Sequence, residues 1–178
     1  GDAKKVKFTP TSVQQRWPVL QSGQVDLLAR NTTITYSRNA SLGVNFQGIN
    51  FYEGQTFVVK TKSNAKTPKD LDGATICVAP GTSTELAIAD YFRVNKLKFT
   101  PILIQDASEI TAAYESGRCD AYTTDASGLY AQRTKLKNPD ENMILPDIIS
   151  KEPLGPSVRQ GDFPWFTVTK WVYYALLN

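Results

Sequence analysis

The feature that most constrains the fold is an alternation of short apolar runs with helix-like segments. Residues 74–79 and 119–122 have the length and apolar content of buried strands, and residues 85–94 place apolar side chains at helical spacing. Residues 56–60 predict a further strand, and residues 163–177 predict a closing amphipathic helix. Strands that alternate with helices favour a doubly wound, mostly parallel sheet, which binds ligands at the carboxyl ends of its strands. We therefore expect an α/β fold.

One sequence pattern occurs twice and suggests two halves. A bulky apolar residue, any residue, Ser-Gly, any two residues and Asp occur at 20–26 and again at 114–120. Glycine is common after a helix, so each copy predicts the end of a helix, a strand and then a polar corner. The alternative is a coincidence of two ordinary helix ends. We expect two lobes, residues 1–57 with 155–178 and residues 58–154, with the C-terminal helix packed on the first.

The first polar corner follows an apolar run at residues 25–29, which predicts a strand. Asn31 and Thr33 are residue types that cap helices, and Arg38 follows within reach of the same helix start. Backbone N–H groups at a helix start, together with a guanidinium, favour binding of a carboxylate. The alternative interpretation is a surface arginine beside an ordinary helix cap.

Composition excludes several classes of function. The chain has no histidine, which excludes Ser-His-Asp and Cys-His catalysis and removes the commonest metal ligand. Its formal net charge of +3 and its scattered basic residues do not predict nucleic-acid binding. No apolar run reaches the roughly 18 residues of a membrane span. The first residues lack the apolar core of a signal peptide, so we expect either no export or a signal that has been removed.

The two cysteines leave two interpretations open. Cys77 and Cys119 lie in the two apolar runs that predict strands, and two cysteines cannot form a structural zinc site alone. If the strands are neighbours, a disulfide can form, which would indicate an oxidising compartment. The alternative is a pair of buried free thiols.

The polar corners of two facing lobes predict a cleft whose residues suit a zwitterion. The guanidinium of Arg38 would hold an α-carboxylate, and Asp125 together with Asn31 would hold an α-ammonium. The alternative role for Asp125 is a plain helix cap. Hydroxyl and N–H groups that would assist at the carboxylate belong to Thr33, Thr82 and Ser83.

Four segments, in order along the chain, resemble the periplasmic substrate-binding proteins of polar amino-acid ABC transporters, in particular their general L-amino-acid branch. The segments are residues 28–38 (LARNTTITYSR), 80–85 (PGTSTE), 117–125 (GRCDAYTTD) and 150–156 (SKEPLGP). The resemblance implies the two-lobed type 2 periplasmic-binding-protein fold and assigns Arg38 to the α-carboxylate and Asp125 to the ammonium. It also implies that Arg16 reaches the side chain of an acidic ligand.

The same resemblance implies a non-catalytic, periplasmic protein that needs no cofactor. Such a protein captures L-amino acids in a cleft and delivers them to the membrane subunits of an ABC permease. Relatives begin with a strand and a helix that should precede Val6, so we expect an N-terminally truncated chain with an incomplete first lobe. An exposed sheet edge on that lobe would be liable to pair with another chain. The alternatives are a dehydratase-like enzyme on the same fold and the ligand-binding module of a receptor.

Overall fold

The protein, seen in a computed structural model that describes residues 2–177, consists of two compact units. Unit 2 is the continuous segment Phe51–Leu154, and unit 1 comprises the described residues on either side of it. The chain therefore leaves unit 1 after Asn50, earlier than the boundary at 57/58 drawn from the sequence. Residues between these two boundaries already belong to strands of unit 2, because Gln55 and Phe57 pair with another strand of its sheet.

Unit 2 is built on a five-stranded sheet with the order β5-β4-β6-β3-β7. Strand β4 runs parallel to β5 and β6, whereas β3 runs antiparallel to β6 and β7, so β3 alone opposes the common direction. The sheet is thus mixed but mostly parallel, as the alternation of strands and helices predicted. The strands are β3 (Gln55–Lys60), β4 (Thr75–Val78), β5 (Thr100–Leu103), β6 (Ala121–Asp125) and β7 (Asn142–Ile144).

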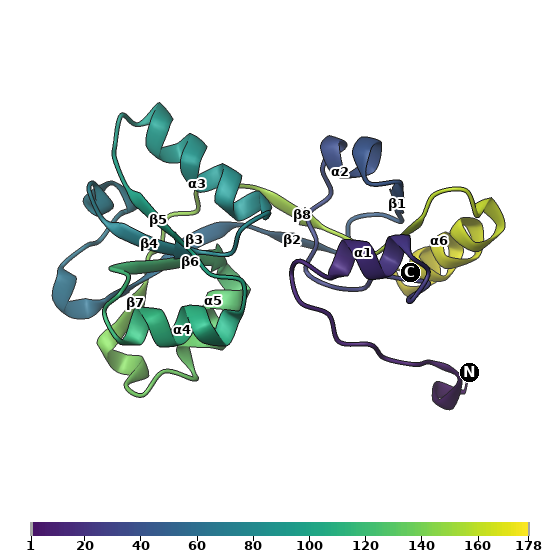
Figure 1. Cartoon of the computed structure of the whole chain (residues 1–178), viewed down its shortest axis with the longest axis horizontal. Helices are drawn as coiled ribbons and strands as arrows, with labels where there is room; N and C mark the ends of the chain where they lie inside the picture. The colour runs from purple at the N-terminus through teal and green to yellow at the C-terminus, as the bar shows by residue number, and fades with distance from the viewer. Residues whose placement is uncertain (1, 178) are drawn as a thin grey trace. The chain divides into compact units, whose positions relative to one another are not determined.

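Helices cover both faces of this sheet (Figure 1). Helix α3 (Ser83–Val94) lies on one face, and α4 (Ala107–Glu115) and α5 (Ala126–Arg133) lie on the other. The side chains of β3 alternate between the two resulting cores: Phe57 packs in the core on the α3 side, and Val58 in the core on the α4 and α5 side. Short 3-10 helices occur at Thr61–Ser63, Pro68–Leu71 and Pro139–Glu141.

A disulfide joins Cys77 of β4 to Cys119, just before β6. The two Cα atoms are 5.6 Å apart, and both residues are buried in the core beside α4 and α5. Of the two interpretations that the sequence left open, the structure shows the disulfide, because β4 and β6 are adjacent strands.

Unit 2 also contains a two-stranded antiparallel ribbon outside the main sheet. It consists of β2 (Phe51–Glu53) and β8 (Glu152–Leu154), with Glu53 directly opposite Glu152. Both strands lie at the ends of unit 2, next to the points where the chain passes to and from unit 1.

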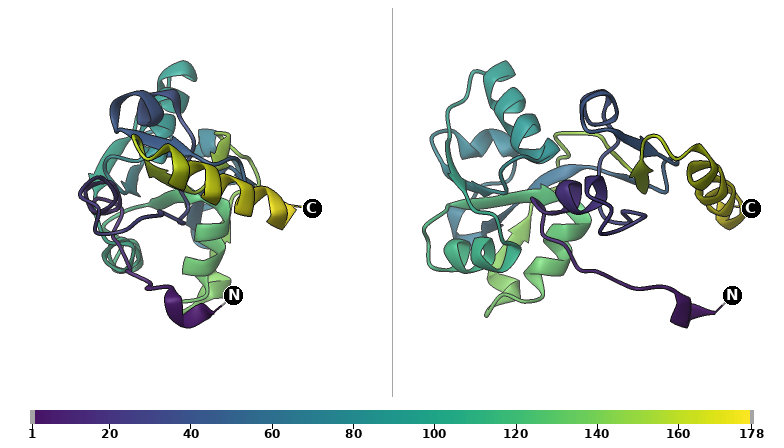
Figure 2. Two further views of the ribbon diagram at one scale, coloured as in Figure 1. Left: turned by 90° about the vertical axis from the view of Figure 1, so that its right-hand side faces the viewer. Right: turned by 45° about the vertical axis from the view of Figure 1, so that its right-hand side comes forward.

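Unit 1 has little regular sheet in its described part. Strands β1 (Val44–Phe46) and β9 (Ser157–Arg159) form an antiparallel pair, and Leu28 adds an isolated bridge to Ser157. The helices are α1 (Arg16–Gln21), α2 (Tyr36–Ser41) and α6 (Phe163–Leu177), with a short 3-10 helix at Ala3–Lys5. The segment before α1 extends away from the helices of this unit (Figure 2).

The strand predicted at residues 25–29 of unit 1 is wrong. In residues 25–29 only Leu28 pairs with a strand, because the Val25 carbonyl accepts a hydrogen bond from the Arg159 guanidinium (2.6 Å) instead of from a neighbouring backbone. A side chain therefore takes the acceptor that a longer strand would need.

The repeated Ser-Gly pattern is confirmed as a repeated helix end. Helices α1 and α4 both terminate at a serine in right-handed helical conformation, followed by a glycine with positive φ: +80° at Gly23 and +79° at Gly117. This left-handed region suits glycine, which has no Cβ to clash. The elements that follow differ, since β6 follows Gly117 but only the Leu28 bridge follows Gly23.

Helix α6 belongs to unit 1, as expected. The hydroxyl of Tyr173 donates to the carbonyl of Ile49, and the Trp165 indole N–H donates to the carbonyl of Asp26 (2.9 Å). Gly48 permits the first contact, since a Cβ there would lie 2.6 Å from the Tyr173 ring. None of the helices in residues 2–177 combines the length and the apolar character needed to cross a membrane.

Candidate functional site

Arg38 is held in a defined position at the start of α2. Its backbone N–H donates to the Oγ1 of Thr35 (3.2 Å), which caps the helix with an extended backbone. The expected cap within residues 31–33 is therefore wrong, because α2 begins only at Tyr36 and Thr35 is its N-cap. Arg38 is 9% exposed, and its guanidinium donates from Nη1 to the carbonyl of Thr33 at 2.7 Å. A surface arginine is excluded by this burial.

Trp17 brings a second arginine to the same place. The Cζ atoms of Arg16 and Arg38 lie 5.3 and 5.5 Å from the centroid of the Trp17 ring, within the range of cation–π attraction. Arg16 is buried and donates from Nη1 to the carbonyl of Asn31 (3.2 Å). The four residues that the sequence assigned to this corner, Arg16, Asn31, Thr33 and Arg38, therefore meet in unit 1. Sequence reasoning missed Trp17, although its position next to Arg16 was a usable signal.

In unit 2, Thr82 and Ser83 lie at the start of α3, beyond the carboxyl end of β4. The Thr82 hydroxyl caps the helix by accepting from the Glu85 N–H (3.1 Å) and itself donates to the Ala79 carbonyl (2.7 Å). Gly81 has a φ of +69°, and its N–H donates to the Glu85 carboxylate at 2.7 Å. This turn places the hydroxyl residues at the sheet end where a doubly wound fold binds its ligands.

Asp125 ends β6 and immediately precedes α5. It is 5% exposed and lies opposite Gln55 in the β3–β6 ladder. Although it occupies the N-cap position, its side chain makes no capping hydrogen bond. Burial and, as a smaller contribution, the charge of Asp125 raise the pKa of Tyr122 to about 12. The helix-cap alternative for Asp125 is therefore not what the structure shows.

Gln55 connects the two corners of unit 2 and was missed by sequence reasoning. It is fully buried, and its Nε2 donates to the Thr84 carbonyl (3.0 Å) and to the Thr123 hydroxyl (2.8 Å). The side chain thus ties the start of α3 to β6, two residues before Asp125. A glutamine heading an otherwise apolar strand was the available signal.

Comparison with known proteins decides the family. Residues 2–163 match the model of the bacterial extracellular solute-binding proteins, family 3. The chain belongs to this family. The family is one of solute-binding proteins and not of enzymes, as the sequence predicted, so the dehydratase alternative is dropped. Among residues 2–177, no cluster of three or more His, Cys, Asp or Glu side chains is arranged to hold a metal ion.

Three similar proteins illustrate the relationship. The general L-amino acid-binding periplasmic protein AapJ of Rhizobium johnstonii is 54% identical over 100% of this chain and 52% of its own length. The glutamate/glutamine/aspartate/asparagine-binding protein BztA of Rhodobacter capsulatus is 48% identical over 99% of this chain and 52% of its own. A periplasmic binding protein from Brucella ovis, solved with glutathione bound, is 54% identical, with a TM-score of 0.95 over 99% of this chain and 56% of that one.

These comparisons also indicate the compartment in which the protein occurs. The family is extracellular by description, and both AapJ and the Brucella ovis protein are named as periplasmic, so the protein is periplasmic, in keeping with its disulfide. The chain spans about half the length of the curated relatives that it matches, 52% in both cases above.

Proposed function

We propose that the protein binds L-α-amino acids, holding the α-carboxylate at Arg38 and the α-ammonium at Asp125, and delivers them to an ABC permease. Asn31 assists at the ammonium, and the hydroxyl and N–H groups of Thr33, Thr82 and Ser83 assist at the carboxylate. A membrane permease then receives the bound amino acid.

The observation that carries the proposal is the fixed, buried guanidinium of Arg38. A planar guanidinium recognises a carboxylate by two parallel N–H···O bonds, and its affinity rises when its orientation is set in advance. The Thr33 carbonyl and the Trp17 ring set that orientation here. Charge-assisted hydrogen bonds each contribute about 1.5–3 kcal/mol, so a few of them support roughly micromolar binding, about 8 kcal/mol, after the cost of ordering.

The ligands named for similar proteins support recognition of the amino-acid head group. AapJ is named for L-amino acids in general, BztA for four acidic and amide amino acids, and the Brucella ovis protein holds glutathione. All of these molecules carry an α-carboxylate and an α-ammonium on one carbon, glutathione at its γ-glutamyl end. Arg16, whose guanidinium lies over the Trp17 ring together with that of Arg38, would hold an acidic side chain. We therefore expect the protein to bind amino acids with several different side chains. We also expect binding to require both the α-carboxylate and the α-ammonium of the ligand.

Calorimetric titration of the full-length protein with matched L- and D-amino acids tests this function. We expect heat with L-amino acids only. Arg38→Ala should weaken binding by about 100-fold or more, because a bidentate charged contact is lost. Arg93→Ala is the control, since Arg93 is an exposed arginine of unit 2 whose ion pair is with Asp90. Absence of heat with every L-amino acid, or equal binding by the Arg38 variant, would contradict the proposal.

A further inference from the structure

The start of α5 is capped by a residue from another element. Its first backbone N–H, that of Ala126, donates to the carbonyl of Gly54 (2.9 Å), and its second, that of Ser127, donates to Oε1 of Glu53 (3.4 Å). The second donor is one that a residue at the N-cap position ordinarily accepts through its own side chain. Asp125 occupies that position and makes no such bond. Glu53 therefore performs the capping that the sequence would assign to Asp125.

We propose that Glu53 is a positioning residue of the ammonium site: by capping α5 in place of Asp125, it keeps the Asp125 carboxylate directed to the ligand's α-ammonium. The inference rests on the proposed function, because it gives Asp125 its ligand role. An aspartate at the N-cap position normally turns back over its own helix, so without Glu53 the Ser127 N–H would draw the Asp125 carboxylate away from the ligand.

The geometry of the β2–β3 junction makes this capping possible. Glu53 ends β2, and the neighbouring Gly54 leads directly into β3, where Gln55 pairs with Asp125. A Cβ at Gly54 would lie 2.3 Å from Cγ2 of Ile148, so glycine allows the junction to lie close to Ile148. The hydrogen bonds from Ala126 and Ser127 show that the junction also lies against the start of α5, where it presents a carbonyl and a carboxylate to the N–H groups of the helix.

The electrostatics of this end of unit 2 support the same role. A carboxylate near the start of a helix interacts favourably with the helix dipole, which suits Glu53 to cap α5. Its second oxygen, Oε2, is buried and accepts no hydrogen bond within residues 2–177.

The test measures how strongly the protein prefers a ligand with an α-ammonium over one without it, and not only the affinity for one ligand. Calorimetry on the full-length protein compares L-glutamine with glutaramate, the same molecule without its α-ammonium; if the panel above selects another amino acid, that compound and its deaminated analogue replace the pair. We expect Glu53→Ala to reduce the preference for the ammonium-bearing ligand on the order of tenfold, since one charge-assisted contact is misplaced. Glu53→Gln should retain the preference, because its amide oxygen still accepts from the Ser127 N–H.

Two controls separate positioning from general damage. Asp106→Ala removes another capping carboxylate of unit 2, which accepts from the N–H groups of Ser108 and Glu109. It should lower stability without changing the preference. In Asp125→Asn, addition of Glu53→Ala should cause no further loss of preference, because the residue through which it acts is already changed.

The outcomes distinguish the inference from the function on which it rests. A wild-type protein that binds no L-amino acid overturns both. Wild-type binding with equal losses for L-glutamine and glutaramate in Glu53→Ala overturns the inference alone, because the residue is then structural. A loss of preference in Glu53→Gln as large as in Glu53→Ala also overturns it, because the effect is then one of charge and not of capping.

Discussion

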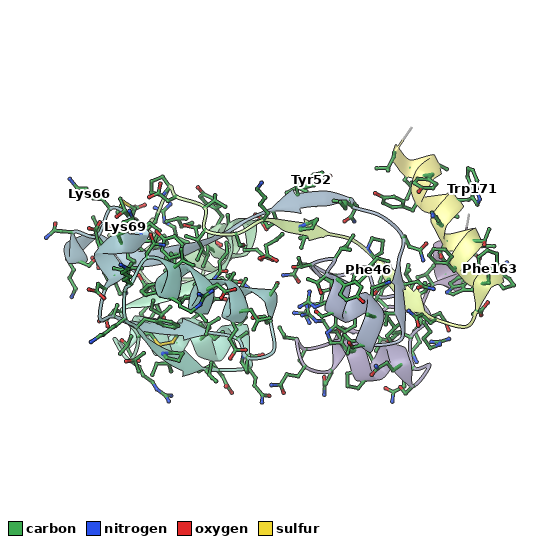
Figure 3. All side chains as sticks on the ribbon, turned by 90° about the horizontal axis from the view of Figure 1, so that it is seen from above. Phe46, Tyr52, Lys66, Lys69, Phe163 and Trp171 are labelled. Atoms are coloured by element: carbon green, nitrogen blue, oxygen red, sulfur yellow. A yellow bond between two sulfur atoms is a disulfide. The ribbon has the colours of Figure 1, made fainter. Side chains whose placement is uncertain are left out.

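The two units differ in how completely they bury their apolar side chains. Unit 2 has a core on each face of its sheet, with Phe57 and Ile76 fully buried on the α3 side and Leu129 on the other. The buried core of unit 1 is one small cluster of Leu20, Leu28 and Val44. Its helix α6 leaves most apolar side chains exposed, Phe163 at 74% and Trp171 at 68%, and both project from the helix in Figure 3.

The difference shows two ways of fixing binding residues. In unit 2 the sheet and its helices hold Asp125 and Thr82, and the buried Gln55 ties them together. In unit 1 the residues around Arg38 hold one another, through the Trp17 ring and through the carbonyls of Thr33 and Asn31. We infer that unit 2 is the more stable, since burial of apolar surface is the main favourable term in folding.

The composition allows the two units to be followed separately. All three tryptophans, Trp17, Trp165 and Trp171, belong to unit 1, so tryptophan fluorescence reports on that unit alone. Peptides resolved by hydrogen-exchange mass spectrometry report on unit 2. If unit 2 is the more stable, the tryptophan fluorescence of unit 1 should change at a lower urea concentration than the amide hydrogen exchange of the unit 2 core.

The largest effect is expected from the disulfide. Replacing Cys77 and Cys119 together by alanine opens a loop with a sequence separation of 42 residues. Loop-closure entropy then predicts a loss of about 4 kcal/mol in the free energy of unfolding of unit 2. Urea titration read by exchange of unit 2 peptides measures it, with tryptophan fluorescence as the internal control. Equal shifts of both signals would show that the units do not unfold independently and would break the comparison.

A matched pair of tyrosines gives the next effect. Tyr114 in unit 2 is fully buried and donates from its hydroxyl to Oδ1 of Asn142 (2.8 Å), and burial raises its pKa well above the ordinary value. Tyr173 in unit 1 donates to the Ile49 carbonyl in a partly buried setting. Tyr114→Phe should cost about 1–3 kcal/mol because a buried acceptor loses its partner, and Tyr173→Phe about 0.5–1.5 kcal/mol. A reversed order in urea unfolding would argue that unit 1 is the better packed.

The smallest effect on stability, below about 0.5 kcal/mol, is expected from changing an exposed apolar residue of α6.

We propose that unit 1 is the surface through which this chain self-associates, since exposed apolar patches favour association. Trp171→Lys should lower the apparent mass in concentration-dependent light scattering. Leu86→Lys is the control, because Leu86 in α3 of unit 2 is similarly exposed at 70%. An equal response of the two variants would exclude a special role for unit 1.

The sequence by itself determined most of unit 2. The positions of α3, β3 and β4 follow from local periodicity, and both Ser-Gly helix ends, those of α1 and α4, appear where the repeat placed them. These features depend on residues close in the chain, so a local pattern carries them. Four short segments of the sequence also indicated the family. The family model, which matches residues 2–163, confirms it.

Tertiary structure alone decided the features that depend on distant partners. Residues 25–29 contribute one bridge because Arg159, far along the chain, takes the Val25 carbonyl. Asp125 does not cap α5 because Glu53 accepts the Ser127 N–H in its place. Strand pairing and capping by another element are contacts between residues distant in sequence. A local sequence pattern therefore does not show which distant residue will make the hydrogen bond. The sequence thus named the residues of the candidate site, and the fold decided which hydrogen bonds each of them makes.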